Sequence, residues 1–184
     1  MIRLFVAIDL PDPVRQRLAA MSCGLPGARW VREEQLHLTL RFIGEVDGAV
    51  FRDIRAALDT VACRPFTLQL DGVGFFPPRG RPRVVWSGVA ANSKLVHLRN
   101  RIESTLVGCG LAPERRRFSP HITLARLNNT PPSRVGRFLE EHNLFLSEPF
   151  MVREFVLYSS VLGQKGAKHY PEERYPLSGD TRLN

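Results

Sequence analysis

One short pattern occurs twice in this chain of 184 residues, and it constrains the fold more than any other feature. The first copy covers residues 37–40 (His-Leu-Thr-Leu) and the second covers residues 121–124 (His-Ile-Thr-Leu). The two histidines are 84 positions apart, which is close to half of the chain. The repeat therefore predicts two related halves, each of which carries one copy.

Each copy alternates polar and apolar residues, which is the period of a β-strand. Side chains two positions apart point to the same side of a strand, so His37 and Thr39 share one face and the neighbouring leucines share the other. The apolar face is expected to pack on the core, and the His/Thr face is expected to meet water, a polar cleft or a ligand. If the two strands face each other across a pseudo-twofold axis, the two imidazoles converge on one point.

A converging pair of histidines suits the opening of a cyclic phosphate. One imidazole removes a proton from the attacking water and the other donates a proton to the leaving oxygen, and both tasks need a pKa near neutrality. Threonine hydroxyls can hydrogen-bond the non-bridging phosphate oxygens. This chemistry needs no metal and no cofactor, and a zinc site built from His37 and His121 would lack a third ligand at any usual spacing. A single His-x-Thr is common as a structural pair, but two copies with apolar flanks favour a function.

The remaining pattern predicts an α+β protein. Strands are expected at 4–10, 30–43, 66–70, 84–89, 121–127 and 150–162, with a last short one near 175–177, and helices are expected to start at 12 and 47 and to cover 94–107 and 133–142. The clearest helix has Leu95, Leu98, Ile102 and Leu106 on one face. The segment from Gln69 to Trp86 is typical of a hairpin, which favours α+β over a doubly wound parallel sheet.

The net charge of +8 favours a polyanionic partner such as RNA, although a basic surface that is only solvated gives the same total. Arginines 115–117 lie just ahead of the second motif, and Arg79, Arg81 and Arg83 flank a proline loop. Both groups can follow an RNA backbone or can be solvated loops, and charge alone leaves both interpretations open. His169 is expected to lie without a role in a charged C-terminal loop.

Other features bear on the compartment. The apolar stretch at 4–8 is too short for a signal peptide, and no run approaches the roughly 18 apolar residues of a membrane span. Three widely spaced cysteines form no metal or redox motif and favour reduced thiols. The sequence therefore predicts a cytoplasmic protein with no membrane partner.

Longer strings around the motifs resemble a known family. Residues 4–8 (Leu-Phe-Val-Ala-Ile), 37–44 (His-Leu-Thr-Leu-Arg-Phe-Ile-Gly) and 119–126 (Ser-Pro-His-Ile-Thr-Leu-Ala-Arg) resemble the 2H phosphoesterases. Within that superfamily they are most similar to the bacterial and archaeal RNA 2′,3′-cyclic phosphodiesterases, first described as 2′-5′ RNA ligases. The resemblance covers nearly the whole chain. It implies one domain over 1–184, with two intertwined lobes, two antiparallel sheets lining a central cleft and helices outside.

The resemblance also implies residue roles. His37 would be the proton donor, His121 the proton acceptor, and Thr39 and Thr123 would contact the phosphate. Five positions after the two histidines stand Phe42 and Arg126, which match family positions that contact the nucleobase and the phosphate, respectively.

These last two residues conflict with the strand pattern. Strict alternation places Arg126 with Ile122 and Leu124, away from His121, and places Phe42 with Leu38 and Leu40. Either each strand bends or bulges after its motif, or these residues act from the edge.

The expected activity is metal-independent hydrolysis of RNA 2′,3′-cyclic phosphate ends to 2′-phosphomonoesters by a monomer. The substrates would be RNA ends or nucleoside cyclic phosphates. A 2′-5′ RNA ligase that runs the reverse reaction needs the same two histidines and stays open as an alternative. A non-catalytic module that binds RNA ends is the third interpretation, and two titrating groups argue against it.

Overall fold

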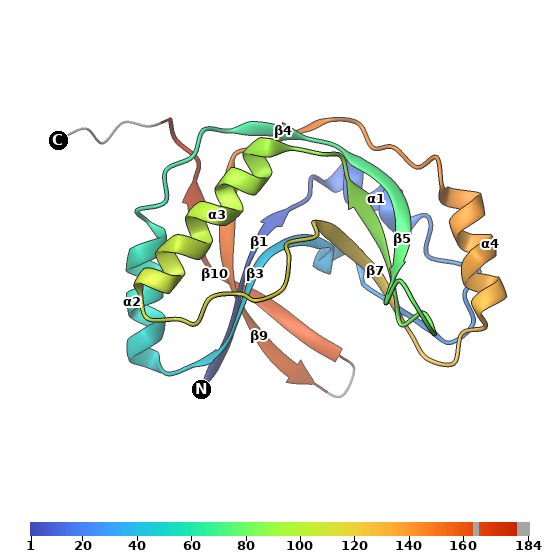
Figure 1. The fold of residues 1–184 in the computed structure, drawn as a ribbon, viewed down its shortest axis with the longest axis horizontal. Helices are drawn as coiled ribbons and strands as arrows, with labels where there is room; N and C mark the ends of the chain where they lie inside the picture. The colour runs from blue at the N-terminus through green and yellow to red at the C-terminus, as the bar shows by residue number, and fades with distance from the viewer. Residues whose placement is uncertain (164–165, 180–184) are drawn as a thin grey trace.

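The computed structural model describes residues 1–163 and 166–179 (Figure 1). In this range, the elements follow one another along the chain in this order: β1 (Ile2–Asp9), α1 (Asp12–Ala19), β2 (Ala28–Trp30), the short 3-10 helix η1 (Glu33–Gln35), β3 (His37–Val46), α2 (Gly48–Leu58), β4 (Phe66–Leu68), β5 (Leu70–Phe76), β6 (Val84–Val89), α3 (Ser93–Gly108), β7 (His121–Leu127), α4 (Pro132–His142), β8 (Phe150–Val152), β9 (Glu154–Gly163) and β10 (Gly166–Pro176). None of the helices among these residues is long and apolar enough to span a membrane.

Two antiparallel four-stranded sheets organise the chain. The first sheet has the order β10-β9-β1-β3 and the second has the order β2-β7-β6-β5, while β4 and β8 form a separate pair. The chain enters the first sheet at β1, passes to the second at β2 and returns at β3, and it crosses again further on. The predicted α+β class with antiparallel sheets is confirmed.

Helices α2, α3 and α4 lie toward the two ends of the molecule. In Figure 1, α2 and α3 lie beside the first sheet at the left and α4 lies beside the second sheet at the right. Helix α3 contacts both α2 and β3, and α4 contacts β5. The predicted stripe of α3, from Leu95 to Leu106, is buried, and the side chain of Asn92 caps the helix by accepting a hydrogen bond from the Leu95 amide at 3.0 Å.

One hydrophobic core connects the sheets. The apolar faces of both motif strands are buried in it: Leu38 and Leu40 from β3, and Ile122 and Leu124 from β7. The prediction of a single domain over 1–184 agrees with this shared core and remains a prediction. Residues 164–165 and 180–184 of that range lie outside the described part of the chain.

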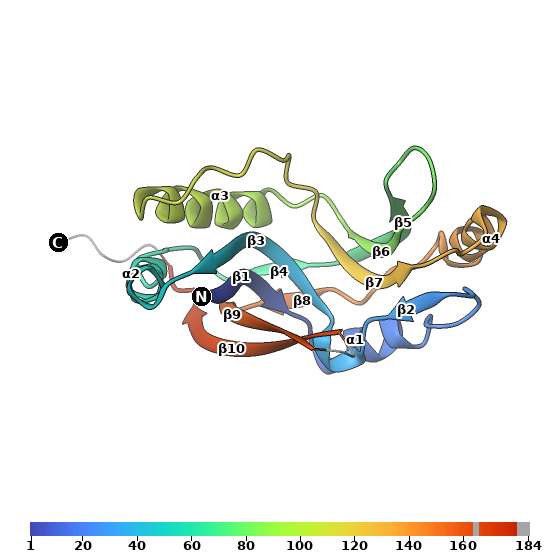
Figure 2. The same cartoon turned by 90° about the horizontal axis from the view of Figure 1, so that it is seen from below.

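The C-terminal segment differs from the expectation. The residues around His169 form no loop but belong to β10, an 11-residue strand that pairs with β9 (Figure 2). This strand is at the edge of the first sheet. An edge strand has one side without a neighbouring strand, so proline, which lacks an N–H donor, and charged side chains are compatible with it. The sequence therefore does not show the alternation typical of a strand here, because it contains Pro171, Glu172 and Glu173.

Candidate active site

Both motif strands contain a β-bulge at the last residue of the four-residue motif. In β3, Thr39 pairs with Ala7 but Arg41 pairs with Val6, so Leu40 is an extra residue in the ladder. In β7, the equivalent shift lies between the pairs Thr123–Trp86 and Ala125–Val85. The extra residue leaves two consecutive buried side chains in each strand.

The bulges determine on which face of their strands Phe42 and Arg126 lie. Because one residue is inserted in each strand, the side chains that follow change faces. Phe42 is 60% exposed, and Arg126 is exposed as well, while Arg41 and Ala125 before them are buried. Phe42 thus shares a face with His37 and Thr39, and Arg126 shares one with His121 and Thr123. Of the two alternatives left by the sequence, the bulge is confirmed.

The two histidines are anchored in the same way. The Nδ1 atom of His37 lies 2.7 Å from the carbonyl oxygen of Gln35, and Nδ1 of His121 lies 2.7 Å from the carbonyl oxygen of Ser119. A carbonyl only accepts, so Nδ1 donates in both cases and Nε2 is the nitrogen left to gain or lose a proton. Each imidazole is therefore fixed by the backbone two residues before it, in a tautomer suited to proton transfer.

Aromatic rings of the first sheet surround His37. Its ring centroid lies 5.0 Å from that of Phe5, 6.4 Å from that of Tyr158 and 5.4 Å from that of His169. Burial lowers the pKa of His37, while the Gln35 carbonyl and the charge of Asp9 raise it and the charge of His121 lowers it. Strands β3 and β7 contact each other directly, so the fold brings the two motif strands together.

Asp9 is held beside His37 by two partners. It stands opposite His37 in the pairing of β1 with β3. The hydroxyl of Tyr158 donates to one carboxylate oxygen of Asp9 at 2.5 Å, and Arg174 donates to the other at 3.1 Å. Burial and the bond to Asp9 raise the pKa of Tyr158, so the phenol stays protonated and keeps donating. A fixed negative charge next to His37 favours its protonated form, which a proton donor requires.

The second histidine has its own aromatic neighbours. The ring of His121 lies 4.9 Å from Phe76, edge to face, and 6.3 Å from Trp86. The Trp86 indole lies over Gly74, where a β-carbon would come within 2.3 Å of the ring, so only glycine permits this arrangement. The Nε1 atom of Trp86 is buried and has no hydrogen-bond partner among the described residues.

His169 is a member of the site that the sequence did not reveal. Its ring meets His37 edge to face and lies 4.9 Å from Phe5. Burial, and to a smaller extent the charge of His37, lower the pKa of His169 to about 4. The sequence offered no signal for this placement, because the contact depends on the pairing of β10 with β9 and of β9 with β1.

Changing His169 to phenylalanine should make the protein less sensitive to acid. Between pH 6.5 and 4 the unfolded chain binds a proton at His169 and the folded chain does not, so folding stability is lost as the pH falls through this window. Thermal unfolding at pH 7, 5.5 and 4 should show a smaller fall in Tm for His169→Phe than for the unchanged protein. The control is His97→Phe, at an exposed position on α3. Equal falls in Tm for both variants would contradict the assignment.

A buried arginine fixes the loop before the second motif. Arg41 is 9% exposed and donates to Glu103 of α3 at 2.6 Å and to the carbonyl oxygen of Ala112 at 2.7 Å, and its guanidinium is 3.4 Å from Glu114. The Glu114 amide in turn donates to Glu103 at 2.7 Å. Segment 111–120 is thus tied to β3 and α3 before it reaches His121.

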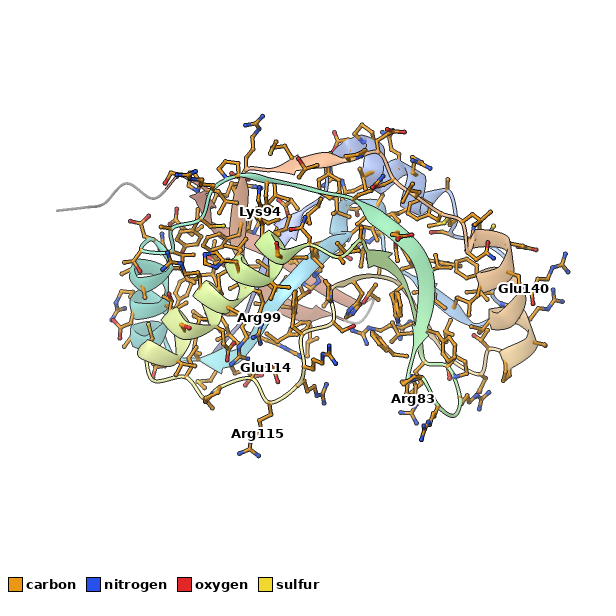
Figure 3. The ribbon with its side chains drawn as sticks, turned by 45° about the horizontal axis from the view of Figure 1, so that its top comes forward. Arg83, Lys94, Arg99, Glu114, Arg115 and Glu140 are labelled. Carbon is orange, nitrogen blue, oxygen red and sulfur yellow. The ribbon has the colours of Figure 1, made fainter. Side chains whose placement is uncertain are left out.

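The arginine-rich segments lie at the same edge of the molecule. Arginines 115–117 are exposed on the tied segment, and Arg115 extends outward in Figure 3. Arg83, at the end of the loop between β5 and β6, extends from the same edge. Figure 2 shows these two loops projecting to one side of the sheets.

Known proteins are similar to this chain in sequence and in fold. Residues 10–164 match the family described as the 2′-5′ RNA ligase superfamily. A protein of Archaeoglobus fulgidus named RNA 2′,3′-cyclic phosphodiesterase is 34% identical over 90% of this chain and 94% of its own length. A protein of the same name from Escherichia coli strain K12 is 31% identical over 96% of this chain and 97% of its own.

Solved structures agree with these relatives. The crystal structure of E. coli LigT complexed with 3′-AMP superposes with a TM-score of 0.79 at 30% sequence identity, covering 96% of this chain and 98% of that one. The crystal structure of TT0787 from Thermus thermophilus gives a TM-score of 0.81 at 29% identity, covering 97% and 99%. On the sequence match and the shared fold together, the chain belongs to the 2′-5′ RNA ligase superfamily of 2H phosphoesterases.

Proposed function

We propose that this chain hydrolyses the 2′,3′-cyclic phosphodiester at RNA ends to a 2′-phosphomonoester. The observation that carries the proposal is the repeated geometry of the two motifs. Each strand presents one imidazole, anchored at Nδ1 by the carbonyl two residues before it, beside a threonine on the same face. The names of the relatives, RNA 2′,3′-cyclic phosphodiesterase, support the same reaction.

The proposed reaction assigns opposite roles to the histidines. Neutral His121 accepts a proton from water through Nε2 as the water oxygen bonds to phosphorus. The bond from phosphorus to the 3′ oxygen breaks, and protonated His37 gives its Nε2 proton to that oxygen. The products are a 2′-phosphate and a 3′-hydroxyl, and the two histidines have exchanged protonation states, which solvent restores.

The remaining site residues would hold the substrate. The hydroxyls of Thr39 and Thr123 would donate to non-bridging phosphate oxygens, where charge grows during the attack. Arg126 would add a positive charge on the side of His121, and the exposed ring of Phe42 would stack on a nucleobase. Both roles depend on the bulges, which place these side chains on the motif faces.

The proposal describes a monomer that acts in the cytoplasm on RNA ends or nucleoside cyclic phosphates. One chain supplies both histidines, so a second copy is not needed to complete the pair. The mechanism uses neither a metal nor a cofactor, because the two imidazoles perform both proton transfers. Ligation would use the same groups in the same roles, with a 5′-hydroxyl in place of water as the nucleophile, but water at ~55 M competes unless a second RNA end is positioned.

Product analysis tests the proposal. An oligoribonucleotide with a 2′,3′-cyclic end is incubated with the protein in excess EDTA, with and without a 5′-hydroxyl RNA. We expect complete conversion to the 2′-phosphate under both conditions, at a rate that EDTA does not change. A 3′-phosphate product, a joined product as the main species, or activity that one divalent ion restores would each contradict it.

A further inference from the structure

Two arginines face each other on the second sheet close to the second motif. Arg29 on β2 stands directly opposite Arg126 on β7. Directly opposite residues of an antiparallel pair have β-carbons about 4.5–5.5 Å apart, and like charges at this distance destabilise the sheet. Both side chains are exposed, and in residues 1–163 and 166–179 neither has an acidic partner. The unliganded protein therefore retains an unfavourable pair of positive charges.

The pair lies on the same face as the proposed catalytic groups. Trp30 and Ala125, which follow and precede the two arginines, pack toward the core, so the arginines point the other way. Because of the bulge at Leu124, the side chain of Arg126 points to the same face of β7 as the side chain of Thr123. Across the bulge, Thr123 and Arg126 stand opposite Trp86 and Val84, which are two residues apart on β6. Measured along the strand, the two arginine side chains therefore begin about 7 Å beyond Thr123.

The chemistry of the pair defines its ligand. Two adjacent guanidinium groups offer parallel N–H donors that match the oxygens of a phosphate, and a phosphate between them removes their repulsion. We propose that Arg29 and Arg126 form one phosphate-binding subsite next to His121 and Thr123, and that Arg29 is a substrate-binding residue. The inference rests on the proposed function for the identity of the anion, but the pairing of the arginines stands on the structure alone.

Two phosphates of an RNA end can occupy this subsite. One is the terminal cyclic phosphate, and the other is the phosphodiester that precedes the terminal nucleotide. A nucleoside 2′,3′-cyclic phosphate has only the first, whereas a dinucleotide with a cyclic end has both. Comparing these two substrates therefore identifies the phosphate that Arg29 binds.

The kinetic experiment replaces Arg29 with methionine, which keeps much of the side-chain length and removes the charge. We expect kcat/KM to fall on the order of tenfold to a hundredfold, the cost of a lost hydrogen bond to a charged group. A loss with both substrates assigns Arg29 to the terminal phosphate, and a loss with the dinucleotide alone assigns it to the preceding phosphodiester. The control is Arg32→Met, where the exposed arginine already has an acidic neighbour, Glu34, at 3.5 Å.

Two further measurements do not depend on turnover. Without ligand, Arg29→Met should have a Tm equal to or above that of the unchanged protein, because the like-charge contact is gone. In calorimetric titration with a dinucleotide that ends in a 2′-phosphate, and so carries both phosphates, Arg29→Met should bind at least tenfold more weakly than the Arg32→Met control. Weaker binding in a chain that shows no hydrolysis would support the subsite and reject the proposed reaction. Unchanged kcat/KM and unchanged affinity in Arg29→Met would reject the subsite and leave the reaction in place.

Discussion

Replacing either His37 or His121 with alanine lowers kcat/KM for a 2′,3′-cyclic phosphate by about 10²–10⁴-fold, the usual contribution of a proton-transfer group. The expectation follows from the repeated anchoring of the two imidazoles, which leaves one Nε2 for each proton transfer. The double variant should lose far less than the product of the single losses, since groups that act in one step are not additive. Steady-state kinetics of the three variants measures this directly.

The choice of leaving group separates the two roles. A nitrophenyl ester has a leaving group acidic enough to depart without a proton donor. With this substrate, His37→Ala should recover much of its lost rate, and His121→Ala should not. Recovery by His121→Ala instead would show that the roles are reversed. Full activity of both variants on the cyclic phosphate would reject the two-histidine mechanism.

The pH dependence of kcat/KM and of kcat tests the roles of His37 and His121 in another way. A proton donor works in its protonated form, and burial lowers the pKa of His37 in the free protein, which shifts the activity seen in kcat/KM toward lower pH. A bound phosphate carries negative charge and raises the pKa of a neighbouring imidazole, so the alkaline limb of kcat should lie at higher pH. Both limbs report the macroscopic pKa values of the pair. Coincident alkaline limbs for the two parameters would contradict this assignment.

Replacing Arg41 with methionine should lower the free energy of unfolding by about 3 kcal/mol, although the residue contacts no proposed substrate atom. The change leaves Glu103, which is 14% exposed, without its partner at 2.6 Å. Breaking a buried ion pair costs about 3–5 kcal/mol, and the lower figure applies because Arg99 stays 3.5 Å from Glu103. Urea unfolding followed by circular dichroism measures the difference.

An exposed pair provides the control for Arg41. Arg137 contacts Glu141 at 2.9 Å on α4, and both side chains are more than half exposed. Arg137→Met should change the free energy of unfolding by at most about 0.5 kcal/mol, because water screens such pairs. Equal losses for the two variants would mean that burial of Arg41 contributes nothing beyond an ordinary surface contact.

The motif strands show which structural features the alternation of polar and apolar residues predicts and which it does not. The apolar faces of both motifs, and the buried stripe of α3, follow from the spacing of their side chains and are confirmed. The bulges do not follow from it, because the residue pairs Leu40-Arg41 and Leu124-Ala125 are compatible with an uninterrupted strand. A bulge is a property of the pairing with a neighbouring strand, here β1 or β6, and the sequence of one strand does not specify that register.

The neighbours of the histidines could not be predicted for a related reason. Phe5 stands next to His37 through one strand pairing, and His169 reaches it through three. Arg41 has the pattern of an ordinary polar strand residue, yet the bulge turns it into the core, where Glu103 neutralises it. Such contacts join residues that are 32 to 132 positions apart, and local patterns have no access to them.

The matched bulges have a consequence for the direction of the reaction. A site with true twofold symmetry would accept a phosphate in two orientations, and each histidine could then serve as donor or acceptor. The equivalent position after each bulge is chemically different, however: a phenyl ring on β3 and a guanidinium on β7. An RNA end is asymmetric in a matching way, because it has a flat base that suits the phenyl ring on one side and charged oxygens that suit the guanidinium on the other. In the proposed reaction, this mismatch between the halves selects one orientation and so determines which ribose oxygen leaves.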